Sequence, residues 1–174
     1  LPEGHGTIVC VRRRVSAAKI AFYLIPNTCI YALNTIQEQL VEICKRHRLD
    51  ALYAFGSRAL AAKNAAEKGI SAADEPPGSD LDIAVKASPK SGLSLGEKVT
   101  IAQELETLFD VSKVDLIDLN QSDPFLAADV IRGERLFCRD EIAADEYELY
   151  VLRRAGDSAY LERKRMELIL NRHL

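Results

Sequence analysis

The alternation of apolar and polar residues predicts where helices and strands lie along the chain. Between residues 34 and 47, apolar side chains recur every three or four positions, which is the spacing of one helix face. Thr35 and Glu38 form a capping box at the start of this segment, because each side chain can accept a hydrogen bond from the other residue's backbone N–H. The pattern therefore predicts a helix with Leu40 and Ile43 on its apolar face.

The rest of the chain alternates between short aliphatic runs and longer helical patterns. The aliphatic runs predict strands at 51–55, 81–85, 114–119 and 135–139. Helices are predicted over 58–68, from Ser94 to about Phe109, from Asp123 to about Arg132, and over most of 141–174 with a break near Gly156. Ser94 and Glu97 form a second capping box. Strands that alternate with helices indicate an α+β (α/β-like) fold, in which helices flank a small mixed sheet and a helical tail follows.

Composition narrows the class of protein. The chain has 174 residues, of which 48% are hydrophobic and 28% charged, and this balance is typical of a soluble globular domain rather than a disordered one. The net charge of −3 does not favour direct nucleic-acid binding. The four cysteines are scattered without a CxxC pair, which argues against a zinc site and for a reducing compartment, here the cytoplasm. No apolar run of about 18 residues predicts a membrane helix.

The N-terminal segment resembles a secretory signal only in part. Arg12, Arg13 and Arg14 precede a short apolar stretch, but Pro26 ends that stretch early and no A-x-A cleavage site follows. We therefore expect residues 1–32 to be an extension outside the functional domain. The alternative is a basic arm that contacts a partner.

Three aspartates carry the first candidate chemistry. Side chains at positions i and i+2 of a strand point to the same face, so Asp80 and Asp82 would place two carboxylates roughly 6.5–7 Å apart. Two such charges repel unless a divalent cation lies between them, and magnesium prefers carboxylates completed by substrate phosphates. Asp115 could supply a third carboxylate from a neighbouring strand. Three carboxylates can hold two metal ions about 3.5–4 Å apart, which suits in-line phosphoryl displacement.

A glycine–serine pair at the end of the strand 51–55 carries the second candidate chemistry, which is phosphate binding. Backbone N–H groups at the start of a helix bind phosphate, and the missing side chain of Gly56 allows a phosphate to approach the backbone. Ser57 can add a hydroxyl donor, whereas Arg58 can add positive charge or face solvent. Alone, a D-x-D sequence, an edge aspartate or a Gly-Ser turn is usually structural; the combination in one order along the chain points to function.

The combined motifs resemble the DNA-polymerase-β-like nucleotidyltransferase superfamily, whose signature is GS, then DxD on a strand, then a third Asp on a later strand. Within it, the segments SDLDIAV, VDLIDL and FLAADVIRGERLFCRD are similar to the minimal nucleotidyltransferases, the MNT antitoxins encoded beside HEPN-domain toxins. The similarity covers roughly residues 34 to 140. It places a nucleotidyltransferase domain at 33–140 and a helical tail at 141–174.

The resemblance implies a role for each candidate residue. Asp80, Asp82 and Asp115 would be catalytic and would hold two Mg²⁺ ions. The nucleotide-binding residues would be Gly56, Ser57, Arg58 and Ser79. An acceptor hydroxyl would attack the α-phosphorus of ATP and pyrophosphate would leave; in the MNT antitoxins the acceptor is a tyrosine of the cognate HEPN ribonuclease toxin. Asp118, three positions after Asp115, should face the opposite side of the sheet and is not assigned to the metals.

Several alternatives stay open at this point. Ser57 and Asp80 are 23 positions apart, longer than in the usual minimal enzymes, and the extra segment could be a lid or a partner-binding ridge. A small-molecule nucleotidyltransferase of the aminoglycoside type is one other function, although about 35 residues after Arg139 leave little room for a substrate domain. A non-catalytic antitoxin that only binds its toxin is another, against which the three retained aspartates argue. A homo-oligomer is also open.

The tail allows two interpretations. Between residues 153 and 172 six basic side chains outnumber three acidic ones, and Tyr160 and Met166 add apolar surface. The segment is either an amphipathic helix packed on its own domain or, in part, a surface that docks a protein.

Overall fold

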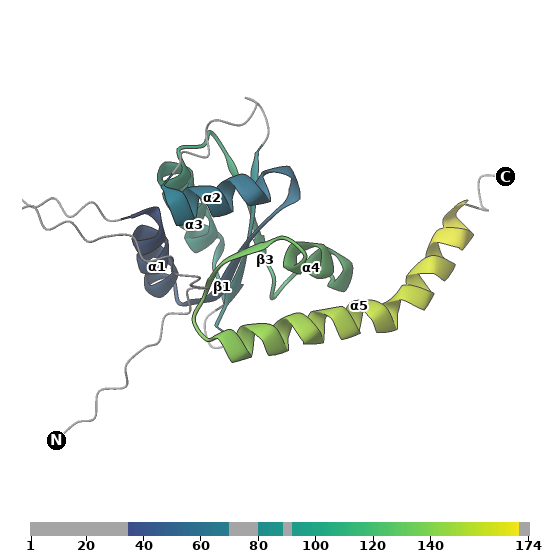
Figure 1. Cartoon of the computed structure of the whole chain (residues 1–174). Helices are drawn as coiled ribbons and strands as arrows, with labels where there is room; N and C mark the ends of the chain where they lie inside the picture. Colours follow the sequence, from purple (N-terminus) through teal and green to yellow (C-terminus); the bar gives the residue numbers. More distant parts are fainter. Residues whose placement is uncertain (1–34, 70–79, 89–91, 171–174) are drawn as a thin grey trace, which may run out of the picture.

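The computed structural model of the chain describes residues 35–69, 80–88 and 92–170. The expectations for residues 1–32, for Ser79 and for the loop 74–78 lie outside these ranges. In chain order the elements are α1 (Ile36–Arg46), β1 (Leu49–Phe55), the 3₁₀ turn η1 (Gly56–Arg58), α2 (Ala59–Lys68), β2 (Leu81–Ala87), α3 (Leu95–Phe109), β3 (Val114–Asp118), α4 (Pro124–Ile131), β4 (Glu134–Cys138) and α5 (Glu141–Leu170). Figure 1 shows their arrangement.

The four described strands form one mixed sheet in the order β3-β2-β1-β4. β1 runs antiparallel to both β2 and β4, whereas β2 and β3 are parallel. The α3 helix connects the parallel pair, as a crossover between parallel strands requires. The predicted α+β fold with a small mixed sheet flanked by helices is confirmed.

Each face of the sheet has its own core. Helices α1, α2 and α3 bury Leu40, Ala62 and Ile101 against one face, together with Leu52 and Ile83 of the central strands. Helices α4 and α5 cover the other face. The capping boxes predicted at Thr35 and Ser94 are both formed, and Asp123 caps α4 ahead of Pro124. These caps fix where the helices begin relative to the strands.

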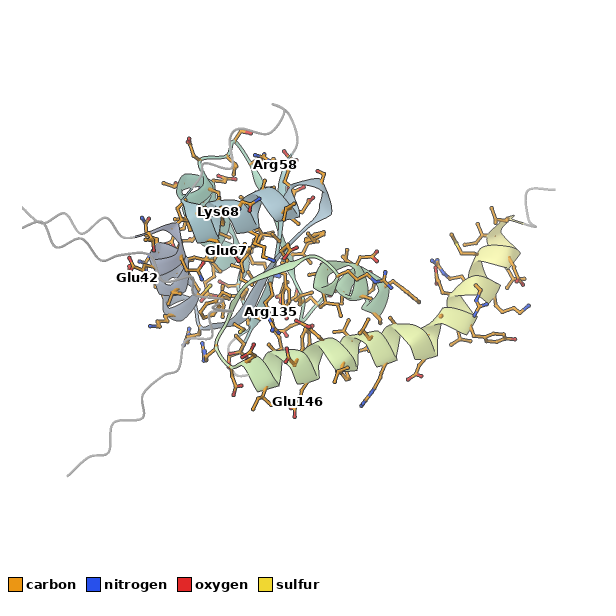
Figure 2. All side chains as sticks on the ribbon, viewed as in Figure 1. Glu42, Arg58, Glu67, Lys68, Arg135 and Glu146 are labelled. Carbon is orange, nitrogen blue, oxygen red and sulfur yellow. The ribbon has the colours of Figure 1, made fainter. Side chains whose placement is uncertain are left out.

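A polar network joins the sheet face under α4 and α5 to the first turns of α5. The hydroxyl of the buried Tyr53 donates to Oε1 of Glu148 at 3.2 Å. The guanidinium of Arg135 donates to Glu148 at 3.0 Å and to Asp145 at 2.7 Å, and Figure 2 shows it between the sheet and α5. The start of α5 is therefore held to both β1 and β4.

The predicted break in the tail is wrong, because α5 continues unbroken from Glu141 to Leu170. A Cβ at Gly156 would meet nothing within 4 Å, and a single glycine costs a helix only about 0.5–1 kcal/mol. Ala144 and Val151 are buried, so the first half of the helix packs on its own domain. The second half extends beyond it (Figure 1). Within the described ranges, no helix combines the length and the apolar character needed to cross a membrane.

A close backbone contact between the α4–β4 turn and the end of β1 yields a stability prediction. A Cβ at Gly133 would lie 2.3 Å from the carbonyl oxygen of Ala54 and 3.0 Å from Cα of Phe55. We expect Gly133→Ala to lower the free energy of unfolding by about 1–3 kcal/mol, because backbone must move to admit the methyl group. Gly156→Ala is the matched control and should raise it by about 0.5–1 kcal/mol. Denaturant unfolding measures both, and equal stability of Gly133→Ala and wild type would contradict the contact.

Candidate active site

The turn after β1 is shaped by a glycine in a left-handed conformation. Gly56 has φ +71°, a backbone conformation that residues other than glycine rarely adopt. A Cβ at this position would lie 2.5 Å from Oδ2 of Asp82, closer than any carbon–oxygen contact allows. Gly56 therefore gives the chain its turn and leaves room for the carboxylate beside it.

The sheet register brings two of the predicted carboxylates to adjacent positions. Asp82 pairs with Phe55 of β1 on one side and with Asp115 of β3 on the other. Asp80 directly precedes the first residue of β2. All three predicted aspartates and the Gly56 turn thus meet at one end of the sheet, where β1 ends and β2 and β3 begin.

A lysine that the sequence interpretation missed lies inside this cluster. The ammonium group of Lys113 forms ion pairs with the carboxylates of Asp80 and Asp115, at 2.8 Å from Oδ1 of Asp115. The hydrogen bonds that Lys113 donates to Asp115 and then to Asp80 raise the pKa of Lys113 above its ordinary value. The available signal was the spacing Lys-x-Asp at 113–115, which places two side chains on one side of an extended segment.

Asp82 lies in an environment that disfavours its negative charge. Burial raises the pKa of its carboxyl above the ordinary value, and the negative charges of Asp115 and Asp80 raise it further, while Lys113 acts in the opposite direction. The described hydrogen bonds and ion pairs give Asp82 no cationic partner of its own. The cluster therefore attracts additional positive charge.

The donor set fits a magnesium ion. Three carboxylates offer the hard oxygen ligands that magnesium prefers, and Lys113 already places a cation between two of them. As the side chains are placed, no three His, Cys, Asp or Glu residues in the described part of the chain enclose a metal position. Two of the three carboxylates are instead bound to the lysine.

The structure separates the predicted nucleotide-binding residues. Gly56 and Ser57 are exposed in η1, immediately before α2. Arg58 is 6% exposed, so the alternative that it faces solvent is wrong. It is the last residue of η1, next to the start of α2 (Figure 2).

Asp118 lies on the other face, as predicted. Its side chain is buried, with Oδ2 at 3.2 Å from the ammonium of Lys98 and Oδ1 accepting from the backbone N–H of Asn120. Because Asp118 is three positions after Asp115, its side chain points to the opposite face of the strand and is not part of the cluster.

Comparisons with known proteins match the chain to one family and to solved structures of the same fold. The family model described as polymerase beta, nucleotidyltransferase matches residues 38–142. No curated protein matches the chain. Among solved structures, a toxin–antitoxin complex with AMP-PNP is 20% identical and covers 79% of this chain and 98% of its own, with a TM-score of 0.57.

Two further solved structures share the fold. A complex of a tri-AMPylated HEPN toxin with an MNT antitoxin from Shewanella oneidensis is 19% identical, covers 80% of this chain and 97% of its own, and has a TM-score of 0.54. The toxin–antitoxin MntA–HepT gives 19% identity, the same coverages and a TM-score of 0.53. At these identities the likeness shows the fold.

Proposed function

Because the chain belongs to the polymerase beta nucleotidyltransferase family, we propose that it transfers AMP from ATP to a hydroxyl group of a protein, a tyrosine of a cognate HEPN toxin, and so acts as an antitoxin. The observation that carries the proposal is the meeting of Asp80, Asp82 and Asp115 beside the Gly56 turn. A transferase that acts on ATP needs both a phosphate-binding turn and carboxylates for metal ions.

Asp80, Asp82 and Asp115 would hold the two magnesium ions. When bound, the ions neutralise phosphate charge and favour the ionised form of the acceptor hydroxyl. Asp82 is central, because it lies between the Gly56 turn and Asp115. Asp115, on the far side of Asp82 from the turn, would lie nearest the attacking hydroxyl.

Gly56 and Ser57 would orient the triphosphate. The first N–H groups of a helical segment have no acceptor within it and are free to bind phosphate oxygens. In the transfer step a bond forms between the acceptor oxygen and the α-phosphorus, and the bond to the oxygen that bridges to the β-phosphate breaks. Pyrophosphate leaves with that electron pair, and the acceptor loses its proton.

The toxin partner is supported by the neighbouring structures. One neighbour is an antitoxin in complex with a tri-AMPylated HEPN toxin, and another holds AMP-PNP, an ATP analogue. Both are covered almost completely by this chain, at 98% and 97% of their length. The similarity therefore extends over almost the whole of each matched chain.

The far end of α5 is where we expect the partner to be held. Met166 and Ile169 continue the helix stripe that begins with the buried Val151, yet 49% and 44% of their surface is exposed. A protein acceptor needs contacts beyond the reacting atoms to bring its hydroxyl to the site. An apolar stripe that runs past its own domain can supply them.

This expectation is tested by the double change Met166→Glu and Ile169→Glu. We expect modification of the partner to fall about tenfold or more, because two charges would lie in the contact. Binding of ATP, measured separately, should not change. Val99→Glu is the control, because it places a charge on an apolar residue of α3 that is 49% exposed, as Met166 is. Unchanged modification by the double variant would place the contact elsewhere.

The function itself is tested by mass spectrometry of intact proteins. The chain is incubated with ATP, magnesium and the HEPN-domain protein encoded in the neighbouring gene. We expect the partner's mass to rise by one or more adenylyl groups. If the partner is bound without a change in mass, the non-catalytic antitoxin is favoured. Transfer to an aminoglycoside but not to the protein would favour the small-molecule enzyme.

A further inference from the structure

Lys113 lies where the site would otherwise hold only negative charge. Its ammonium group forms ion pairs with two of the three aspartates, at positions that come from different strands. The third, Asp82, follows Asp80 by two residues and pairs in register with Asp115. The lysine thus links the start of β2 to the start of β3 across the cluster.

The backbone of Lys113 is fixed on both sides. Its carbonyl oxygen accepts from the N–H of Leu81 at 3.1 Å, which sets it beside the start of β2. The N–H of the next residue, Val114, donates to a carboxylate oxygen of Glu106 in α3 at 3.0 Å. The side chain itself is 54% exposed and carries a flexible four-carbon stem, so it can leave the carboxylates without any movement of the strand.

A metal ion and the ammonium group compete for the same oxygens. Oδ2 of Asp80 and Oδ1 of Asp115 bind the lysine directly, and these are the carboxylates that the proposed function assigns to magnesium. Two cations cannot share those oxygens at contact distance without strong repulsion. Occupation by the lysine and occupation by the metal are therefore alternative states.

We propose that Lys113 is a positioning residue: it holds the carboxylates of Asp80 and Asp115 together in the metal-free protein and is displaced when a divalent cation binds. The inference rests on the proposed function only in taking these aspartates as metal ligands. Lys113 then has two effects on the cluster. The lysine prevents the carboxylates from repelling one another before the metal arrives, and it weakens metal binding by competition.

The experiment measures metal binding without nucleotide. Mn²⁺ is titrated into the full chain and free ion is followed by electron paramagnetic resonance, for wild type and for Lys113→Met. We expect the variant to bind Mn²⁺ about three- to tenfold more tightly, the size expected when exposed ion pairs no longer compete. Thermal unfolding should show a lower Tm than wild type in EDTA and a larger rise in Tm with magnesium.

Two variants serve as controls. Lys113→Arg keeps a cation that can bridge the carboxylates and should bind Mn²⁺ within about twofold of wild type. Lys86→Met removes a positive charge from the face of β2 that carries Asp82. Lys86 lies about 13 Å from Asp82 along the strand and pairs with Asp50 at 3.4 Å. It should leave Mn²⁺ affinity unchanged. If Lys113→Met does not fold, Lys113→Gln provides the same comparison with a neutral donor.

Unchanged or weaker Mn²⁺ binding by the folded neutral variants would overturn the inference, because a competing cation can only reduce affinity. Tighter binding by Lys86→Met as well would also overturn it, since bulk charge would then explain the effect. A failure of the proposed function appears differently. The wild-type chain would not modify its partner, whatever the order of Mn²⁺ affinities.

Discussion

Replacing Asp82 with Asn is expected to lower nucleotide transfer by about 1,000-fold or more while leaving the fold intact. Asp82 pairs in register with Asp115 and lies against the Gly56 turn, so it lies between the proposed phosphate-binding turn and the third carboxylate. Loss of its charge removes the central ligand for the metal ions that stabilise the reacting phosphate. Transfer is measured as label passed from α-phosphorus-labelled ATP to the partner.

The same variant should be as stable as wild type, or slightly more stable, in EDTA. Burial and the charges of Asp115 and Asp80 disfavour the ionised form of Asp82, so a neutral side chain of equal size relieves repulsion. Asp80→Asn should lose transfer without that gain, because Asp80 is paired with Lys113. Asp129→Asn, an exposed change on α4, is the activity control. A large fall in Tm with normal transfer would contradict the site.

Gly56→Ala is expected to lower transfer by about 100-fold or more. The left-handed backbone at this position costs a residue with a side chain roughly 1–2 kcal/mol, and the added carbon would collide with Oδ2 of Asp82. Either the turn or the carboxylate must shift, and a displacement of about 1 Å at a reacting centre can cost about 100-fold. The rate of transfer and the affinity for ATP measure the effect.

Gly69→Ala separates backbone strain from the collision. Gly69 has nearly the same dihedral, φ +67°, at the end of α2, but a Cβ there would meet nothing within 4 Å. It should cost about 1 kcal/mol of stability and leave transfer unchanged. If both variants lose transfer equally, general destabilisation rather than the contact with Asp82 is responsible.

The sequence predicted most of the fold because its signals are local. Capping residues such as Thr35 and Ser94 act within one turn of helix, and both predicted caps are formed. The strand 81–85 was found two residues short of its observed end at Ala87, because the aliphatic run is followed by Lys86. The break predicted at Gly156 was wrong because a lone glycine does not end a helix that is otherwise well formed.

The site was harder to predict where it depends on which strands are neighbours. The period of a strand places Asp115 and Asp118 on opposite faces without any knowledge of the fold. The ion pairs of Lys113 instead require that β3 lie parallel to β2 with Leu81 opposite Val114, a pairing between distant segments. The periodicity of the following helix likewise did not show the η1 turn or the burial of Arg58.

The central claim is that this chain transfers AMP, through the cluster of three aspartates, to a hydroxyl of a protein. The most direct measurement incubates it with magnesium, the neighbouring HEPN-domain protein and ATP labelled at either the α- or the γ-phosphorus. The account predicts label on the partner from α-labelled ATP alone, release of pyrophosphate, and neither result with Asp82→Asn. Label from γ-labelled ATP, or equal labelling by wild type and Asp82→Asn, would contradict it.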